Sequence, residues 1–168
     1  ASALRDSLRG AGGVRISTLE NGLVLAVVES HEAPIVTTVL WVSSGASADG
    51  AGKGGTAHFL EHMMFKGSAS FGPGEIDRLT QVLGGSNNAF TSYDSTAYHF
   101  ELASDRWQKA LAMESDRMAG LRLEAREVES ERQVILEEIS MYESEPWDAL
   151  ETQVREALFG DHPYGRPV

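Results

Sequence analysis

The segment His58-Phe59-Leu60-Glu61-His62 constrains the fold of this 168-residue chain more than any other. At about 100° per residue on an α-helix, His58, Glu61 and His62 fall within about 100° of one another and share one face. Two imidazoles one turn apart can bind a single zinc ion through ring nitrogens, and a carboxylate beside them can act as a general base. The motif predicts a helix that carries a catalytic metal site; the alternative is a surface helix with two unrelated histidines.

A catalytic zinc site needs a third protein ligand, and the helix expected over residues 124–142 offers several glutamates. The apolar stripe of this helix consists of Val128, Ile135, Ile139 and Tyr142. Glu131 and Glu138 flank the stripe on one side, whereas Glu137 lies opposite to it and is expected to face water. Helical periodicity leaves open which of Glu131 and Glu138 reaches the metal.

The composition excludes several classes of protein. A formal net charge of −11 argues against non-specific binding to nucleic acids and to anionic membranes. The absence of cysteine excludes disulfides and thiolate ligands, which leaves histidines and carboxylates for any metal. No run of 18 apolar residues occurs, so no membrane span is expected. A signal peptide is absent from this chain, and we expect a soluble protein of either the cytoplasm or the periplasm.

Hydrophobic patterning predicts an α+β fold, with an antiparallel or mixed sheet and helices packed on one side. Residues 1–13 are expected to form a flexible segment, and residues 14–168 a zinc-binding domain. Asn21-Gly22 predicts a hairpin turn, and Thr56 and Ser104 are the expected N-caps of two helices. Three antiparallel strands are expected over residues 14–19, 23–28 and 35–42, and two more strands over 88–92 and 96–102. Helices are expected over residues 56–65, 75–83, 104–118, 124–142 and 146–160.

Four segments carry a resemblance to a known family. H-x-x-E-H is the inverted zincin pattern, and HFLEHMMFKG resembles the signature of the pitrilysin/insulinase family, which includes the mitochondrial processing peptidases. GGSNNAFTSYDSTAYHFEL is similar to the edge-strand region of that family, and ESERQVILEE to its E-x-x-x-x-x-x-E segment. The segment from Asp161 to Tyr164 is similar to another family landmark. The resemblance implies the N-terminal part of a metallopeptidase half of the mitochondrial-processing-peptidase type.

This resemblance implies a role for each matched residue. His58 and His62 would be zinc ligands, Glu61 the general base and Glu138 the third ligand, for one zinc ion per active site. Glu131 matches the first glutamate of the family segment, an acid that supports the metal site from behind the ligands. The substrate would bind along an exposed edge strand that contains Asn88, Ala89, Phe90 and Thr91.

The expected function is that of a zinc metalloendopeptidase that hydrolyses extended peptides or presequence-like segments. The family has two homologous halves, so the chain is expected to be a truncated first half, weakly active or inactive without a second half or a partner subunit. Two alternatives remain: a non-catalytic binding or scaffold subunit (or fragment) of a two-subunit peptidase, and a structural zinc domain. A scaffold would not need His58, Glu61 and His62 together, and a structural site prefers four ligands without a base.

Overall fold

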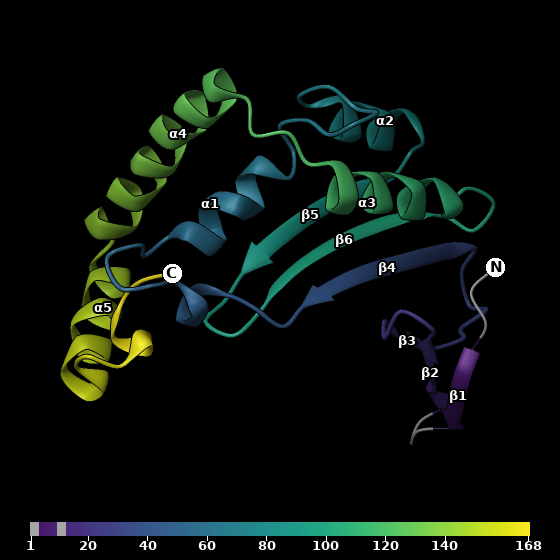
Figure 1. Cartoon of the computed structure of the whole chain (residues 1–168), viewed down its shortest axis with the longest axis horizontal. Coiled ribbons are helices and arrows are strands. Elements are labelled where there is room, and N and C mark those ends of the chain that lie inside the picture. Colours follow the sequence, from purple (N-terminus) through teal and green to yellow (C-terminus); the bar gives the residue numbers. More distant parts are fainter. Residues whose placement is uncertain (1–3, 10–12) are drawn as a thin grey trace. The chain divides into compact units, whose positions relative to one another are not determined.

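The computed structural model describes residues 4–9 and 13–168, with side chains from residue 13 onward. The chain divides into two units, residues 1–34 and 35–168, which are described separately (Figure 1). The helices and strands form an α+β fold, as expected. The first unit contains strands β1 (Leu4–Arg9), β2 (Arg15–Leu19) and β3 (Val24–Val27). The second contains β4 (Ile35–Val42), β5 (Ser86–Thr91), β6 (Thr96–Ala103), the short 3₁₀ helices η2 (Ala46–Ala48) and η3 (Pro163–Gly165), and the helices α1 (Thr56–Met63), α2 (Glu75–Val82), α3 (Gln108–Gly120), α4 (Ala125–Ser144) and α5 (Pro146–Phe159).

The first unit is an antiparallel sheet with the strand order β1-β2-β3. The predicted turn between β2 and β3 is confirmed: Gly22 has φ +89°, and its N–H donates to the carbonyl oxygen of Leu19 at 2.9 Å. The side chain of Asn21 accepts a hydrogen bond from the Leu23 N–H at 3.1 Å, which closes the turn locally. Within the segment expected to be flexible, residues 4–9 form β1 and pair with β2, whereas residues 1–3 and 10–12 lie outside the described residues.

The second unit is built on an antiparallel sheet with the order β4-β6-β5. The expectation that residues 35–42 continue the N-terminal strands is wrong, because β4 pairs with β6 in a register from Ile35↔Ala103 to Val42↔Thr96. A run of β-branched residues predicts a strand but carries no information about its partner. Strand β5 lies at one edge of this sheet and pairs with β6 from Ser86↔Glu101 to Thr91↔Thr96.

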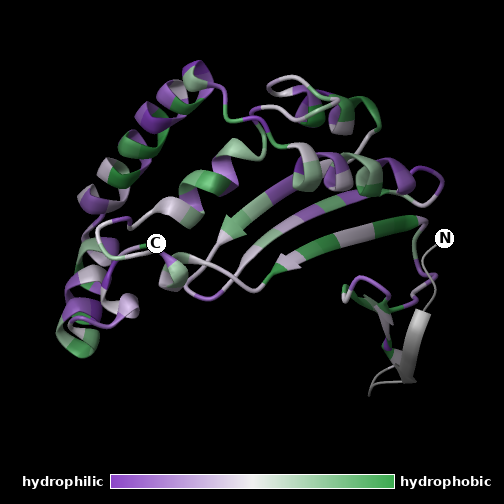
Figure 2. Cartoon of the chain, viewed as in Figure 1, coloured by the Kyte–Doolittle hydropathy of each residue, from purple (hydrophilic) through white to green (hydrophobic). Residues whose placement is uncertain are grey.

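Helices α1, α2 and α3 cover one face of this sheet, as the sequence predicts (Figure 1). The core between α2, α3 and β6 consists of Ile76, Phe100, Leu102, Ala110 and Met113. The opposite face of the sheet carries exposed apolar side chains, and β4 is largely hydrophobic in Figure 2. Helix α3 begins at Gln108, because residues 104–107 form a turn and not the helical start expected at Ser104.

The two C-terminal helices complete the second unit. Helix α4 packs against α1 and continues through a bend at Glu145 into α5. Pro146 occupies the first turn of α5, where its missing N–H leaves no bond unmade. Within the described residues, none of the helices combines the length and the apolar character needed to cross a membrane. The contact between α1 and α4 brings the two predicted metal-ligating segments together.

Candidate metal centre

Helix α1 is held at its N-terminus by a side chain from the preceding loop. Gly55 is the N-cap and has φ +82°, a left-handed conformation that glycine adopts without steric strain. The carboxylate of Asp49 accepts hydrogen bonds from the backbone N–H groups of Thr56 and Ala57 at 2.9 and 3.0 Å. Thr56 is therefore the first helical residue and not the predicted N-cap, because Asp49 supplies the acceptor.

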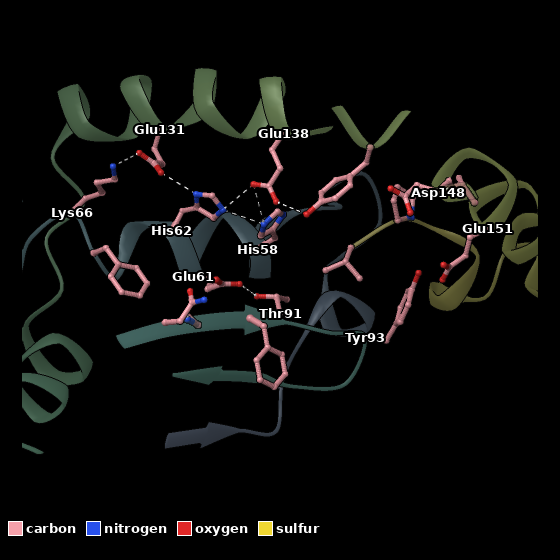
Figure 3. Close-up of a pocket in the computed structure, with 18 of the residues that line it drawn as sticks. His58, Glu61, His62, Lys66, Thr91, Tyr93, Glu131, Glu138, Asp148 and Glu151 are labelled. Carbon is pink, nitrogen blue, oxygen red and sulfur yellow. Dashed lines mark hydrogen bonds and ion pairs between the residues drawn. The ribbon is translucent and has the colours of Figure 1, made fainter. Parts of the chain in front are cut away.

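Three potential metal ligands converge between α1 and α4. The Nε2 atoms of His58 and His62 are 3.1 Å apart. The Oε2 atom of Glu138 lies 3.4 Å from the His62 Nε2 and 3.8 Å from the His58 Nε2 (Figure 3). Ligands bound tetrahedrally to zinc at about 2.0–2.2 Å are about 3.3–3.6 Å from one another. The spacing of these three atoms fits a zinc ion.

The two carboxylate oxygens of Glu138 have different neighbours. Oε2 faces the histidines, whereas Oε1 accepts a hydrogen bond from the hydroxyl of Tyr142 at 3.0 Å. This hydrogen bond raises the pKa of Tyr142, because it favours the protonated phenol beside a carboxylate. Tyr142 and Ile139 were expected in the buried stripe of α4, but they are 48% and 40% exposed. Glu137 is exposed, as predicted.

Glu131 lies behind the histidines and not beside the converging ligand atoms. Its Oε1 lies 2.9 Å from the Nδ1 of His62, and its Oε2 lies 2.6 Å from the Nζ of Lys66. The carboxylate is buried, and burial alone would raise the pKa of Glu131. The hydrogen bonds and charges of Lys66 and His62 outweigh this effect and hold the pKa below its usual value. An Nδ1 bonded to a carboxylate leaves the Nε2 of His62 free to bind a metal.

Glu61 lies on the sheet side of α1. Its Oε2 accepts a hydrogen bond from the hydroxyl of Thr91 at 2.6 Å, which joins α1 to the end of β5 (Figure 3). Only 9% of Glu61 is exposed, so this bond and the surrounding packing together limit how the carboxylate can move. Thr91 was predicted as part of the substrate strand, yet its side chain is directed at Glu61.

The four residues predicted for the substrate strand lie at the edge of the sheet and line the same cavity as the histidines. Asn88 and Phe90 are exposed, and the Phe90 ring contacts Trp41 edge-on, with centroids 6.1 Å apart. Ala89 and Thr91 are half-buried, and the backbone N–H of Ala89 donates to the side chain of Asn88 at 2.9 Å. Within the described part of the chain, no further strand pairs with the free edge of β5.

The cavity over the site has a volume of about 750 Å³ and is predominantly acidic. Among the residues that the structure describes, two cations line it, and each is paired with a carboxylate of the same cavity: Lys66 with Glu131 at 2.6 Å, and Arg155 with Glu151 at 2.7 Å. The remaining carboxylates in its wall are those of Glu61, Asp77, Glu138 and Asp148. The cavity therefore carries an excess of negative charge.

Sequence reasoning missed three contacts at this site. They are the contact of Lys66 with Glu131, that of Tyr142 with Glu138, and that of Asp49 with the first backbone N–H groups of α1. Tyr142 follows Glu138 by four residues on α4, a spacing that places side chains side by side on a helix, so this contact had a usable signal. Lys66 lies beyond the end of α1 and contacts Glu131 on another helix, so its contact had none. The contact of Asp49 with α1 depends on the path of a loop and has no such signal.

The comparisons with known proteins agree with the fold and the motif. The family description "Insulinase (Peptidase family M16)" matches residues 24–168. The chain is 36% identical over 166 residues to an uncharacterised zinc protease of Mycobacterium leprae, covering 99% of this chain and 37% of that protein. It is 33% identical over 155 residues to the mitochondrial-processing peptidase subunit beta of Dictyostelium discoideum, covering 92% of this chain and 33% of that subunit.

Solved structures show the same similarity. A protease from Helicobacter pylori superposes with a TM-score of 0.85 at 28% identity, covering 98% of this chain and 38% of that one. Pitrilysin superposes with a TM-score of 0.82 at 27% identity, covering 95% of this chain and 17% of its own. The chain belongs to the insulinase family of peptidases. It spans little more than a third of the length of the M. leprae relative.

Proposed function

We propose that this chain provides the zinc-binding centre of a metalloendopeptidase that cleaves extended peptides or presequence-like segments. The main support for the proposal is the spacing of three potential ligand atoms. The Nε2 atoms of His58 and His62 are 3.1 Å apart, and the Oε2 of Glu138 lies 3.4 Å from the His62 Nε2 and 3.8 Å from the His58 Nε2. Two imidazole nitrogens and one carboxylate oxygen are the donors that zinc accepts in catalytic sites. Relatives named zinc proteases support the same metal.

A zinc ion held by these residues would polarise the scissile carbonyl and lower the pKa of a water at its open position. Glu61 acts as the general base that takes a proton from the attacking water and later transfers it to the leaving amine. The hydroxyl of Thr91 holds this carboxylate in place through the 2.6 Å hydrogen bond. Glu131 orients the ring of His62 through its Nδ1.

The substrate is proposed to bind as an additional strand along the free edge of β5. An extended peptide can form main-chain hydrogen bonds with a sheet edge, and this edge leads to Thr91 and Glu61. The side chain of Asn88, which now accepts from the Ala89 N–H, would have to release that group. The acidic cavity favours the approach of positively charged peptides.

The active enzyme is proposed to require a second homologous half or a partner subunit. The length of this chain relative to its relatives supports that arrangement. A structural zinc site is disfavoured, because within the described residues the only cluster of potential ligands contains three residues and not four. A purely scaffolding role is disfavoured by the presence of a buried carboxylate, Glu61, that lines the same cavity as the two histidines.

Replacing Glu61 by glutamine tests the proposal. The amide cannot accept a proton, but His58, His62 and Glu138 keep their coordinating atoms. We therefore expect Glu61→Gln to retain zinc and to lose peptide hydrolysis in the full-length protein. Metal analysis beside a fluorogenic peptide assay measures both properties, with Glu137→Gln as the control that loses an exposed carboxylate. Hydrolysis at the wild-type rate in Glu61→Gln would contradict the role of Glu61.

A further inference from the structure

Lys66 is the residue of the metal centre that sequence reasoning does not account for. It lies just beyond α1, and its backbone N–H donates to the carbonyl oxygen of Met63 at 2.9 Å. Its Nζ lies 2.6 Å from the Oε2 of Glu131, although the side chain of Lys66 is 32% exposed and that of Glu131 only 5%. The lysine therefore reaches inward to a buried carboxylate.

The two oxygens of Glu131 have separate partners, which fixes the plane of the carboxylate. Oε1 lies 2.9 Å from the His62 Nδ1, and Oε2 is held by Lys66 (Figure 3). With only one of these contacts, the carboxylate could rotate about its Cγ–Cδ bond. Within the described residues, no hydrogen bond reaches the buried Oε2 of Glu131, and the ion pair with Lys66 is the contact that compensates its charge.

A buried carboxylate that loses its cationic partner is left uncompensated, which is strongly unfavourable. Without Lys66, Glu131 would rotate toward solvent, and this rotation would weaken its contact with His62. The imidazole would then lose the hydrogen bond that fixes its orientation and keeps Nε2 directed at Glu138. Contacts behind metal ligands typically change metal affinity by about 10- to 100-fold.

We infer that Lys66 is a positioning residue of the metal centre, which acts through Glu131 on His62 and raises the affinity for zinc. This inference rests on the proposed function, since it assumes that His62 binds the metal. Lys66 touches neither the converging ligand atoms nor Glu61 by any close contact in the structure. Its expected effect is therefore on zinc affinity, through Glu131, and not on the chemistry of proton transfer.

A double-mutant cycle tests the inference in the full-length protein. The variants are Lys66→Met, Glu131→Gln and the combination of both, and the measurement is zinc affinity by competition with a chelator. We expect each single variant to bind zinc about 10- to 100-fold more weakly than the wild type. We expect the double variant to be no more than about threefold weaker than Glu131→Gln, because the ion pair with Glu131 is the contact that links Lys66 to His62.

Two further variants distinguish a positioning role of Lys66 from a general effect of removing a lysine. Lys66→Arg keeps the charge and the donors and should restore affinity to within a few-fold of the wild type. Lys109→Met removes an exposed lysine on α3 and should leave affinity unchanged. Circular dichroism shows which variants are folded; if Lys66→Met is not, Lys66→Gln takes its place, since it keeps a hydrogen-bond donor without the charge.

The outcomes distinguish this inference from the proposed function. If the wild-type protein does not bind zinc, the proposed function fails. If the wild type binds zinc and Lys66→Met or Lys66→Gln binds it equally well, the positioning role is wrong. If the losses of the two single variants multiply in the double variant, Lys66 acts independently of Glu131, and the inference is also wrong.

Discussion

Glu138 and Glu137 are adjacent on α4, and exchanging each for glutamine provides a closely matched comparison. The Oε2 of Glu138 lies 3.4 and 3.8 Å from the two histidine nitrogens, whereas Glu137 is exposed. Both substitutions remove one negative charge from the same helical turn. An effect of the net charge alone should appear in both variants, so a loss of zinc affinity confined to Glu138→Gln reports the carboxylate that lies at the site.

The magnitude follows from the number of ligands. Loss of a contact behind a ligand weakens metal binding by about 10- to 100-fold, so loss of one of three direct ligands should exceed that range. We expect Glu138→Gln to weaken zinc binding by at least about 100-fold, equivalent to about 2.7 kcal/mol. Glu137→Gln removes a solvated carboxylate and should change the free energy of unfolding by no more than about 0.5 kcal/mol.

The assay is a titration of zinc against a competing chelator for the wild type and both variants, in the full-length protein. The hydroxyl of Tyr142 donates a hydrogen bond to the Oε1 of Glu138. In Glu138→Gln the amide oxygen would keep this hydrogen bond, so the amide nitrogen, which cannot coordinate zinc, would face the histidines. Release of zinc by Glu137→Gln, or an affinity of Glu138→Gln within threefold of the wild type, would refute the assignment of the third ligand.

Three further predictions concern Thr91 beside the site and two residues of α3. Thr91→Val removes the hydroxyl that donates to Glu61, and this loss should lower kcat about tenfold in a peptide assay while zinc content and KM stay close to wild type. Thr91→Ser keeps a hydroxyl and should restore kcat. An unchanged kcat in the valine variant would contradict the role of this bond. Arg117 is fully buried and forms a two-fold hydrogen bond with Glu114, so Arg117→Met should lower the free energy of unfolding by about 3–5 kcal/mol in urea titrations, and a loss below 1 kcal/mol would be inconsistent with an essential buried pair. Hydrogen bonds from two serine side chains hold the pKa of Asp116 below its usual value of 3.8. A carboxyl group with a lowered pKa stabilises the fold above its unfolded pKa, and this contribution is lost as the pH falls through the folded pKa. The difference in Tm between wild type and Asp116→Asn should therefore be largest near neutral pH and shrink below about pH 4, and a difference that grows with acid would contradict this sign.

Local patterns predicted the elements well. The β2–β3 turn at Asn21-Gly22, the helices and strands β2 to β6 lie close to their expected positions, because backbone conformational preference and hydrophobic periodicity act within a few residues. Strand β1 falls in the segment that was expected to be flexible. The predicted start of α3 at Ser104 was wrong, since residues 104–107 form a turn and the helix begins only at Gln108. The partner of β4 was also wrong, because strand pairing joins residues far apart in sequence.

The metal centre shows the same division between local and tertiary information. By itself, the sequence determines that His58, Glu61 and His62 share one face of a helix, because 3.6 residues per turn fixes their directions. Periodicity could not separate Glu131 from Glu138, since both flank the same stripe of α4. Only the packing of α4 across α1 places Glu138 near the Nε2 atoms and Glu131 against the Nδ1 of His62. Helical periodicity specifies angles around an axis, whereas the distance between atoms on two helices depends on how their side chains pack.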